Sequence, residues 1–210
     1  MTATDSSHHS ELTIDGRFVR AFVDGVLETC GYFEERARRI LASHGIDDPE
    51  PGVSYPLGAY LDALEEVQRT TGPNTLNRIG RATPAALQWS PGVRTIEDAF
   101  ENLDRALDRA HDGSGAGEFT FRATDDGGLL VADSPYPDAF ERGLVEGIGK
   151  HFGTDTGFIA IADAGSHPAD GGDAREFDLT WWETRDERKT ISPPADRPQP
   201  TATADRASAD

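Results

Sequence analysis

The most regular pattern of apolar and polar positions lies in residues 138–152. Large apolar side chains recur there at every fourth position: Phe140, Leu144, Ile148 and Phe152. This spacing places them on one side of an α-helix. Pro137 suits the first helical turn, because its ring presets φ and its missing N–H would have no partner there. Gly153 suits the end. The pattern therefore predicts a central helix.

Two glycines, Gly143 and Gly147, lie one helical turn apart beside this apolar stripe. Each destabilises a helix interior by about 1 kcal/mol relative to alanine, so a close neighbour has to compensate. We expect a sheet to pack closely against them. Because they lie inside a helix, we interpret the glycines as packing positions and not as a nucleotide-binding loop.

The chain before residue 112 has mostly helical spacing. The expected helices cover residues 14–31, 32–44, 57–72, 74–79 with a continuation over 84–89, and 95–111. Thr95 and Asp98 are three residues apart, which predicts a capping box at the start of the last helix. The sequence therefore indicates an N-terminal half built from helices.

After residue 111 the period changes to two, which is typical of strands. The expected strands cover residues 118–122, 129–132, 158–162 and 176–182. The Asp-Asp-Gly-Gly sequence at 125–128 predicts a hairpin turn between the first two. The third strand is apolar on both faces, which predicts the interior of a sheet, and a loop is expected over 163–174.

Together these elements predict an α/β (α+β) fold in a single domain over residues 13–184. Its N-terminal helical half packs on a four-stranded, mainly antiparallel sheet that carries the central helix. Residues 1–12 and 185–210 lack periodicity and are rich in small and polar residues. We expect both to be disordered tails, the second acidic and rich in proline.

The composition is strongly acidic, with a net charge of −18 from 38 acidic and 20 basic residues. Because the charge is spread along the chain, we interpret it as adaptation to concentrated salt, as in a haloarchaeal protein. It argues against a nucleic-acid partner.

No apolar run approaches the roughly 20 residues of a membrane span, and the N-terminus does not resemble a signal peptide. We expect a cytoplasmic, halophilic protein. Its single cysteine, Cys30, excludes an internal disulfide.

Candidate catalytic residues are few. Asp133, Glu141 and His151 lie near one another in sequence, and a carboxylate beside a histidine can act as a general base, so a hydrolase-type enzyme stays open as an alternative. His167 shares the 163–174 loop with several aspartates, but their spacing matches no calcium loop. We expect no metal site and no enzymatic activity.

The remaining candidate is an apolar ligand site between the central helix and the sheet. Its expected lining consists of Tyr136, Phe140, Leu144, Phe177, Leu179 and Trp181. Aromatic side chains line many small-molecule pockets. They also fill cores of this size, and the sequence leaves both interpretations open.

Several motifs carry a resemblance to a known family. A helical half with Tyr55-Pro-Leu57 precedes a glycine-rich hairpin, Ser134-Pro-Tyr-Pro137, the helix run 140–148 and a last strand ending Leu-Thr-Trp-Trp at 179–182. This order resembles the 4-vinyl-reductase-type and heme-NO-binding-like sensory domains. The resemblance covers residues 14–183 and implies helices on an antiparallel sheet, a small hydrophobic ligand and a sensory role.

The sequence differs from such domains at the positions that would hold a cofactor. The cysteine cluster of many vinyl-reductase-type domains is missing, with Asp138 following Pro-Tyr-Pro. The heme-binding Tyr-x-Ser-x-Arg pattern is matched only in part, by Glu118-Phe-Thr-Phe-Arg122. We therefore expect no cofactor. The expected function is a non-enzymatic sensing or signalling domain with a small hydrophobic ligand and a partner protein; a homodimeric adaptor is the other alternative.

Overall fold

The computed structural model describes residues 12–27, 32–113, 116–125, 127–153, 158–167 and 174–182. The expected tail 185–210 and all of tail 1–12 except Leu12 lie outside the described residues, as does Cys30. So do residues 168–173 of the expected loop.

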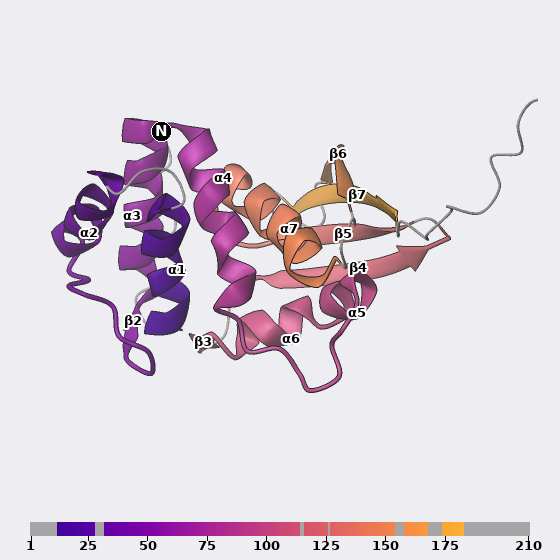
Figure 1. The fold of residues 1–210 in the computed structure, drawn as a ribbon, viewed down its shortest axis with the longest axis horizontal. Coiled ribbons are helices and arrows are strands. Elements are labelled where there is room, and N and C mark those ends of the chain that lie inside the picture. Colours follow the sequence, from indigo (N-terminus) through magenta and orange to yellow (C-terminus); the bar gives the residue numbers. More distant parts are fainter. Residues whose placement is uncertain are drawn as a thin grey trace, which may run out of the picture.

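Within these ranges the N-terminal half is helical, and one further long helix follows β5 in the chain and lies between α4 and the strands of the C-terminal half (Figure 1). The helices are α1 (Gly16–Leu27), α2 (Tyr32–Ser43), α3 (Leu57–Thr71), α4 (Pro73–Ala82), the 3-10 turn η1 (Thr83–Ala85), α5 (Ile96–Glu101), α6 (Leu103–Asp108) and α7 (Asp138–Phe152). The strands are β1 (Thr13–Asp15), β2 (Ser54–Pro56), β3 (His111–Asp112), β4 (Glu118–Thr124), β5 (Gly127–Asp133), β6 (Phe158–His167) and β7 (Ala174–Trp182).

The described strands form two antiparallel sheets. The larger has the order β4-β5-β7-β6 and the smaller the order β2-β1-β3. The α/β fold class, the helical N-terminal half, the four-stranded sheet and the central helix α7 are confirmed. The small sheet was not predicted, because its strands of two or three residues are too short to show a period of two.

The sheet order corrects the prediction for the third strand. β6 is an edge strand, paired only with β7 in the described sheet, and not an interior one. Ala160 and Ala162 are exposed while Ile161 is partly buried, so at these positions the strand is buried on one face at most. β6 also continues through His167, where a loop was expected.

Two helix predictions also need correction. The capping box of Thr95 and Asp98 is present, but the helix that it starts is interrupted at Asn102, giving α5 and α6. The expected continuation over 84–89 is only the short turn η1. The segment after η1 folds back against this turn, because Nε1 of Trp89 donates a hydrogen bond to the carbonyl oxygen of Pro84 at 2.8 Å.

Glycines allow α7 to lie directly on α4. A Cβ added to Gly143 would come within 2.0 Å of the carbonyl oxygen of Asn77, and one at Gly147 within 2.5 Å of that of Arg81. On the other helix, a Cβ at Gly80 would meet the Phe140 carbonyl oxygen at 2.1 Å. The glycines are packing positions as predicted, but the close neighbour is helix α4 and not the sheet.

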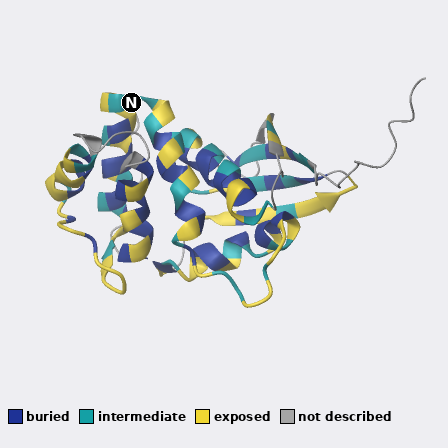
Figure 2. Ribbon diagram, viewed as in Figure 1, coloured by how far each residue is buried: buried dark blue, intermediate teal, exposed yellow. Residues whose placement is uncertain are grey.

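Buried residues are concentrated where α1, α3, α4 and α7 pack on one another and on the strands beside α7 (Figure 2). The core contains two groups of aromatic side chains. Phe18, Tyr60, His111, Tyr136 and Phe140 form the first, which we call the tyrosine cluster. Phe100, Phe121 and Trp181 form the second, the sheet cluster. The first joins the helical half to α7, so it is the better placed for a ligand that acts on both.

Candidate ligand site

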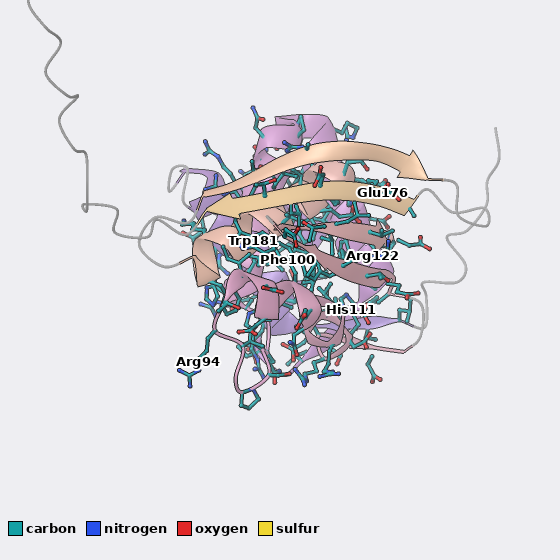
Figure 3. The ribbon with its side chains drawn as sticks, turned by 90° about the vertical axis from the view of Figure 1, so that its right-hand side faces the viewer. Arg94, Phe100, His111, Arg122, Glu176 and Trp181 are labelled. Carbon is teal, nitrogen blue, oxygen red and sulfur yellow. The ribbon has the colours of Figure 1, made fainter. Side chains whose placement is uncertain are left out.

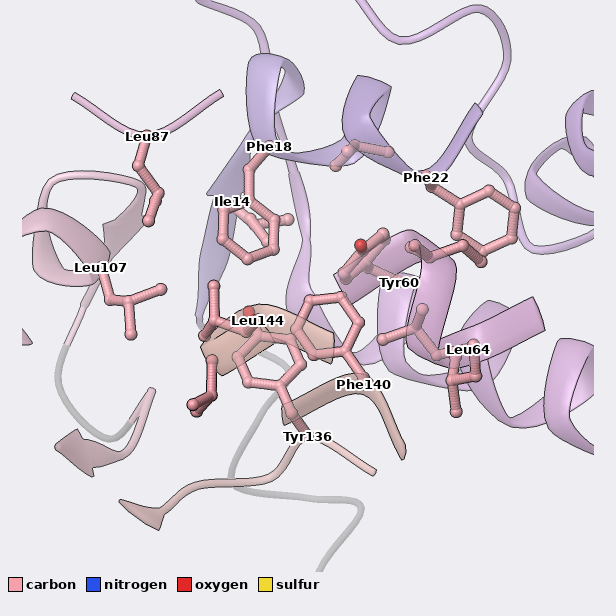
Figure 4. Close-up of a cluster of buried hydrophobic side chains, with 14 of the residues drawn as sticks. Ile14, Phe18, Phe22, Tyr60, Leu64, Leu87, Leu107, Tyr136, Phe140 and Leu144 are labelled. Carbon is pink, nitrogen blue, oxygen red and sulfur yellow. The ribbon is translucent and has the colours of Figure 1, made fainter. Parts of the chain in front are cut away.

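The tyrosine cluster draws one ring from each of five segments. Phe18 comes from α1, Tyr60 from α3, His111 from β3, Tyr136 from the turn before α7 and Phe140 from α7 itself. The centroids of Tyr136 and Phe140 are 4.9 Å apart in a stacked arrangement, and Phe18 stacks on Tyr136 at 5.9 Å. Figure 4 shows Phe18, Tyr60, Tyr136 and Phe140 pointing toward one another.

A hydrogen-bonded chain crosses the cluster. The Nδ1 atom of His111 lies 2.6 Å from the carbonyl oxygen of Leu107, and its Nε2 atom lies 2.5 Å from the hydroxyl oxygen of Tyr136. A carbonyl oxygen can only accept, so Nδ1 carries the proton and donates. Nε2 of the neutral ring then accepts from the Tyr136 hydroxyl. Burial lowers the pKa of His111, while the Leu107 carbonyl and the Asp108 charge raise it.

Tyr60 lacks such a partner. Its hydroxyl oxygen is buried and has no hydrogen bond to any described residue. Burial raises the pKa of Tyr60 far above its ordinary value, so the group stays a neutral O–H and keeps its ability to donate. An unpaired buried hydroxyl costs roughly 1–3 kcal/mol. The site therefore has a donor ready for an acceptor atom.

Arg175 of β7 ties the turn of Tyr136 to the sheet. Its Nε donates to Oε2 of Glu141 at 2.6 Å, its Nη2 donates to the carbonyl oxygen of Tyr136 at 2.8 Å, and its Nη1 pairs with Asp138. Ser134 donates to the other oxygen of Glu141. Burial is the largest influence on Glu141 and raises its pKa to about 8, while the Ser134 bond lowers it and the Asp133 charge raises it. The guanidinium of Arg175, 2.6 Å from Oε2, opposes this shift because it stabilises the ionised carboxylate.

The predicted ligand-binding residues fall in different parts of the core. Tyr136, Phe140 and Leu144 lie together at the tyrosine cluster (Figure 4). Phe177 and Leu179 are buried on β7. Trp181 belongs to the sheet cluster, where its ring stacks on Phe100 at 6.1 Å (Figure 3). It lies six residues beyond Arg175, or about 20 Å along an extended strand.

Sequence reasoning missed three residues of this site: Tyr60, His111 and Arg175. Tyr60 lies on the apolar face of the expected helix 57–72, which by itself indicates only a core residue. His111 ends the expected helix 95–111, a position typical of helix capping. The signal for Arg175 was a pair of carboxylates, Asp138 and Glu141, in one helical turn, because a carboxylate on a buried helix face requires a cation.

Two residues of the hydrolase alternative, Glu141 and His151, do not converge. Glu141 is fully buried against Arg175, whereas His151 is exposed near the end of α7. Ten positions along α7 separate them by about 15 Å along the helix axis. Within the described residues, no three His, Cys, Asp or Glu side chains are arranged to hold a metal ion. No helix of that part of the chain is long and apolar enough to cross a membrane.

Comparison with solved structures defines the fold. No protein-family model and no curated protein matches the chain. An oxygen-binding H-NOX domain related to soluble guanylate cyclases, solved as its oxygen complex, is 17% identical with a TM-score of 0.59, covering 80% of this chain and 95% of that one. An H-NOX mutant of T. tengcongensis is 16% identical with a TM-score of 0.59, covering 80% and 97%. A structure solved for a study of heme redox potential and porphyrin distortion is 16% identical with a TM-score of 0.60, covering 84% and 100%. The chain has the H-NOX fold, which confirms the heme-NO-binding-like part of the resemblance at the level of fold.

The residues present do not fit the heme named in one of those structures. Both ring nitrogens of His111, the buried histidine of the described core, are already hydrogen-bonded, so neither is available to iron. Rings 4.9–6.5 Å apart fill the tyrosine cluster, where a flat macrocycle would need space. Thr120 and Arg122, the partial match to the heme motif, are exposed on β4. The chain therefore shares the H-NOX fold, but packed side chains occupy its core where a heme would need space.

His111 should make stability depend on pH. Its pKa is lowered in the fold from 6.5, so the unfolded chain takes up a proton first as the pH falls. We expect the free energy of unfolding to decrease below pH 6.5 until the folded-state pKa is passed. Urea titrations of wild type and His111→Gln across this range measure the effect, which the variant should lack. His151→Gln, at an exposed position, should keep it; identical profiles for wild type and His111→Gln would contradict this role.

Proposed function

We propose that this chain is a non-enzymatic sensory domain that binds a small, mainly apolar ligand at the tyrosine cluster. The observation that supports this most directly is the buried hydroxyl of Tyr60, which has no partner among the described residues. Because rings fill the cluster, the ligand would bind by displacing the ring of Tyr136. The H-NOX fold of sensory proteins agrees with such a role. The apolar lining and the misfit to heme favour a relationship to the 4-vinyl-reductase type.

The ligand chemistry follows from the lining. Phe18, Phe140 and Leu144 offer apolar surface, and Tyr60 offers one donor. A ligand with an aromatic or aliphatic body and a single acceptor atom, such as a carbonyl oxygen, would satisfy that donor. Relieving an unpaired buried hydroxyl adds to the gain from apolar burial, so the acceptor selects among ligands of similar shape.

The signal would leave the site through the turn before α7. Tyr136 belongs to the cluster through its ring and to the Arg175 interaction through its carbonyl oxygen. A ligand that displaces the ring therefore strains the contact between this turn and β7. The partner would detect this change on the sheet. The same proposal includes a partner protein that receives the signal, a cytoplasmic location, and an acidic surface adapted to concentrated salt.

Two tyrosine-to-phenylalanine variants test the state of the two hydroxyls. Without ligand, Tyr60→Phe removes an unpaired polar atom, so we expect unchanged or higher stability, by up to about 1–3 kcal/mol. Tyr136→Phe leaves Nε2 of His111 without its donor and should lower stability by a similar amount. Denaturant unfolding measures both. Equal destabilisation by the two variants would show that Tyr60 has a partner in solution.

Ligand binding is tested with two neutral probes of similar size. Acetophenone carries a carbonyl acceptor and isopropylbenzene carries none. NMR titrations of the labelled protein should show tighter binding of acetophenone, with shifts at Tyr60 and Tyr136. Tyr60→Phe should abolish the preference by weakening acetophenone alone. Binding of neither probe, or an unchanged preference in Tyr60→Phe, would refute the proposed site.

A further inference from the structure

A hollow of about 570 Å³ lies on the surface, where α1, the α4–η1 junction and the end of α7 meet. These helices lie next to one another in Figure 1. Its charged rim consists of Arg17, Arg20, Arg81 and Lys150, with Asp24 as the only carboxylate among its described lining residues, and His151 beside them. In a chain with 38 acidic and 20 basic residues, this concentration of cations opposes the overall charge.

One of these cations occupies an unfavourable position, and another has no partner among the described residues. Arg17 lies in the first turn of α1, which has no acidic residue there, and Arg20 lies in the second turn. The N-terminus of a helix is its positive end, so a cation in the first turn destabilises it. Arg20 is exposed and makes no ion pair or hydrogen bond within the described part of the chain. A role outside the folding of α1 would account for both residues.

The ion pairs of Arg17 and Arg81 are weak. Arg17 lies 3.6 Å from Asp15, and Arg81 lies 3.8 Å from Glu146, with both arginine side chains more than 40% exposed. Exposed pairs of this kind contribute about 0–1 kcal/mol. Either guanidinium can therefore turn to another anion at little cost, and its planar array of donors suits phosphate or carboxylate oxygens.

We propose that the hollow binds a small organic anion with at least two negative charges, either a phosphate or a polycarboxylate. The guanidinium groups of Arg20 and Arg81 would hold the charged end. Pro84, Ala85 and Leu87 supply apolar surface for the rest of the molecule. The volume is within the range of small-molecule sites, roughly 300–1,000 Å³. This site is separate from the tyrosine cluster, so the test of anion binding is independent of the test of the proposed sensory function.

Titration with inorganic pyrophosphate and with citrate, followed by NMR at constant ionic strength, tests the proposal. We expect saturable binding, with shifts concentrated at α1, η1 and the end of α7. Arg20→Ala and Arg81→Ala should each weaken it about tenfold or more, as for a lost charged hydrogen bond. Arg94→Ala is the charge-matched control, since Arg94 is exposed on a separate loop (Figure 3) and should leave the affinity within about twofold.

The two probes also separate the two chemistries. Tighter binding of pyrophosphate assigns the site to phosphates, and tighter binding of citrate assigns it to polycarboxylates. Equal weakening by Arg20→Ala, Arg81→Ala and Arg94→Ala would show only diffuse electrostatic attraction and overturn the proposal. Shifts that rise linearly without saturation would overturn it as well. Circular dichroism of each variant verifies that it is folded.

Discussion

Gly143→Ala should destabilise the protein by about 3 kcal/mol or more, although alanine is the better helix former. The new Cβ would lie 2.0 Å from the carbonyl oxygen of Asn77, a backbone atom that can move only if α4 and α7 separate. Their separation would disturb Phe140 and the whole tyrosine cluster. Thermal and denaturant unfolding measure the loss.

Gly58→Ala in α3 is the matched control for this substitution. No atom lies within 4 Å of a Cβ built at Gly58, so only the gain in helix propensity remains, up to about 1 kcal/mol. The two variants make the same chemical change in two helices and should shift stability in opposite directions. Similar effects of both would contradict the close contact of α4 and α7.

Removing one partner of the buried ion pair between Glu141 and Arg175 should also lower the free energy of unfolding strongly. Arg175→Met leaves the fully buried Glu141 carboxylate without its cation, which we expect to cost about 3–5 kcal/mol. Replacing both residues, as Glu141→Leu with Arg175→Met, should restore much of the loss, because no charge then remains buried. Chemical denaturation of the two single variants and the double variant measures the coupling.

The exposed pair of Arg38 and Glu34 in α2 provides the comparison. Its side chains are 42% and 37% exposed, so Arg38→Met should change stability by at most about 1 kcal/mol. If Arg175→Met were as mild as Arg38→Met, the ion pair would not hold the turn of Tyr136. The signalling route proposed through that turn would then fail.

The sequence was sufficient for the parts of the fold that depend on local patterns. The four-residue spacing from Phe140 to Phe152 predicted α7, and the spacing of Thr95 and Asp98 predicted a capping box that the structure contains. Each depends on residues within a few positions of one another, which is the range over which periodicity and capping act.

Long-range contacts were not accessible in the same way. Nothing near Gly143 in sequence indicates that Asn77, 66 residues away, is its neighbour, so a sheet was expected in place of α4. Apolar residues on both faces of β6 predict an interior strand, whereas pairing alone decides which strand is the edge. Which hydrophobic faces meet is set by tertiary packing.

The same limit applied to the candidate site. Tyr136, Phe140 and Leu144 could be proposed together because they lie on one turn and helix, and the structure places them together (Figure 4). Tyr60 and His111 reach the same place from distant segments. The unpaired state of the Tyr60 hydroxyl is a property of three-dimensional packing, so no spacing in the sequence could reveal it.

Native mass spectrometry of the protein purified under mild conditions is the most direct test of a ligand at the tyrosine cluster. We predict a retained small molecule in wild type, lost or reduced in Tyr60→Phe and kept in the surface variant Arg94→Ala. A wild-type mass equal to that of the bare chain, together with an experimental structure showing an ordered water bonded to the Tyr60 hydroxyl, would contradict the proposal.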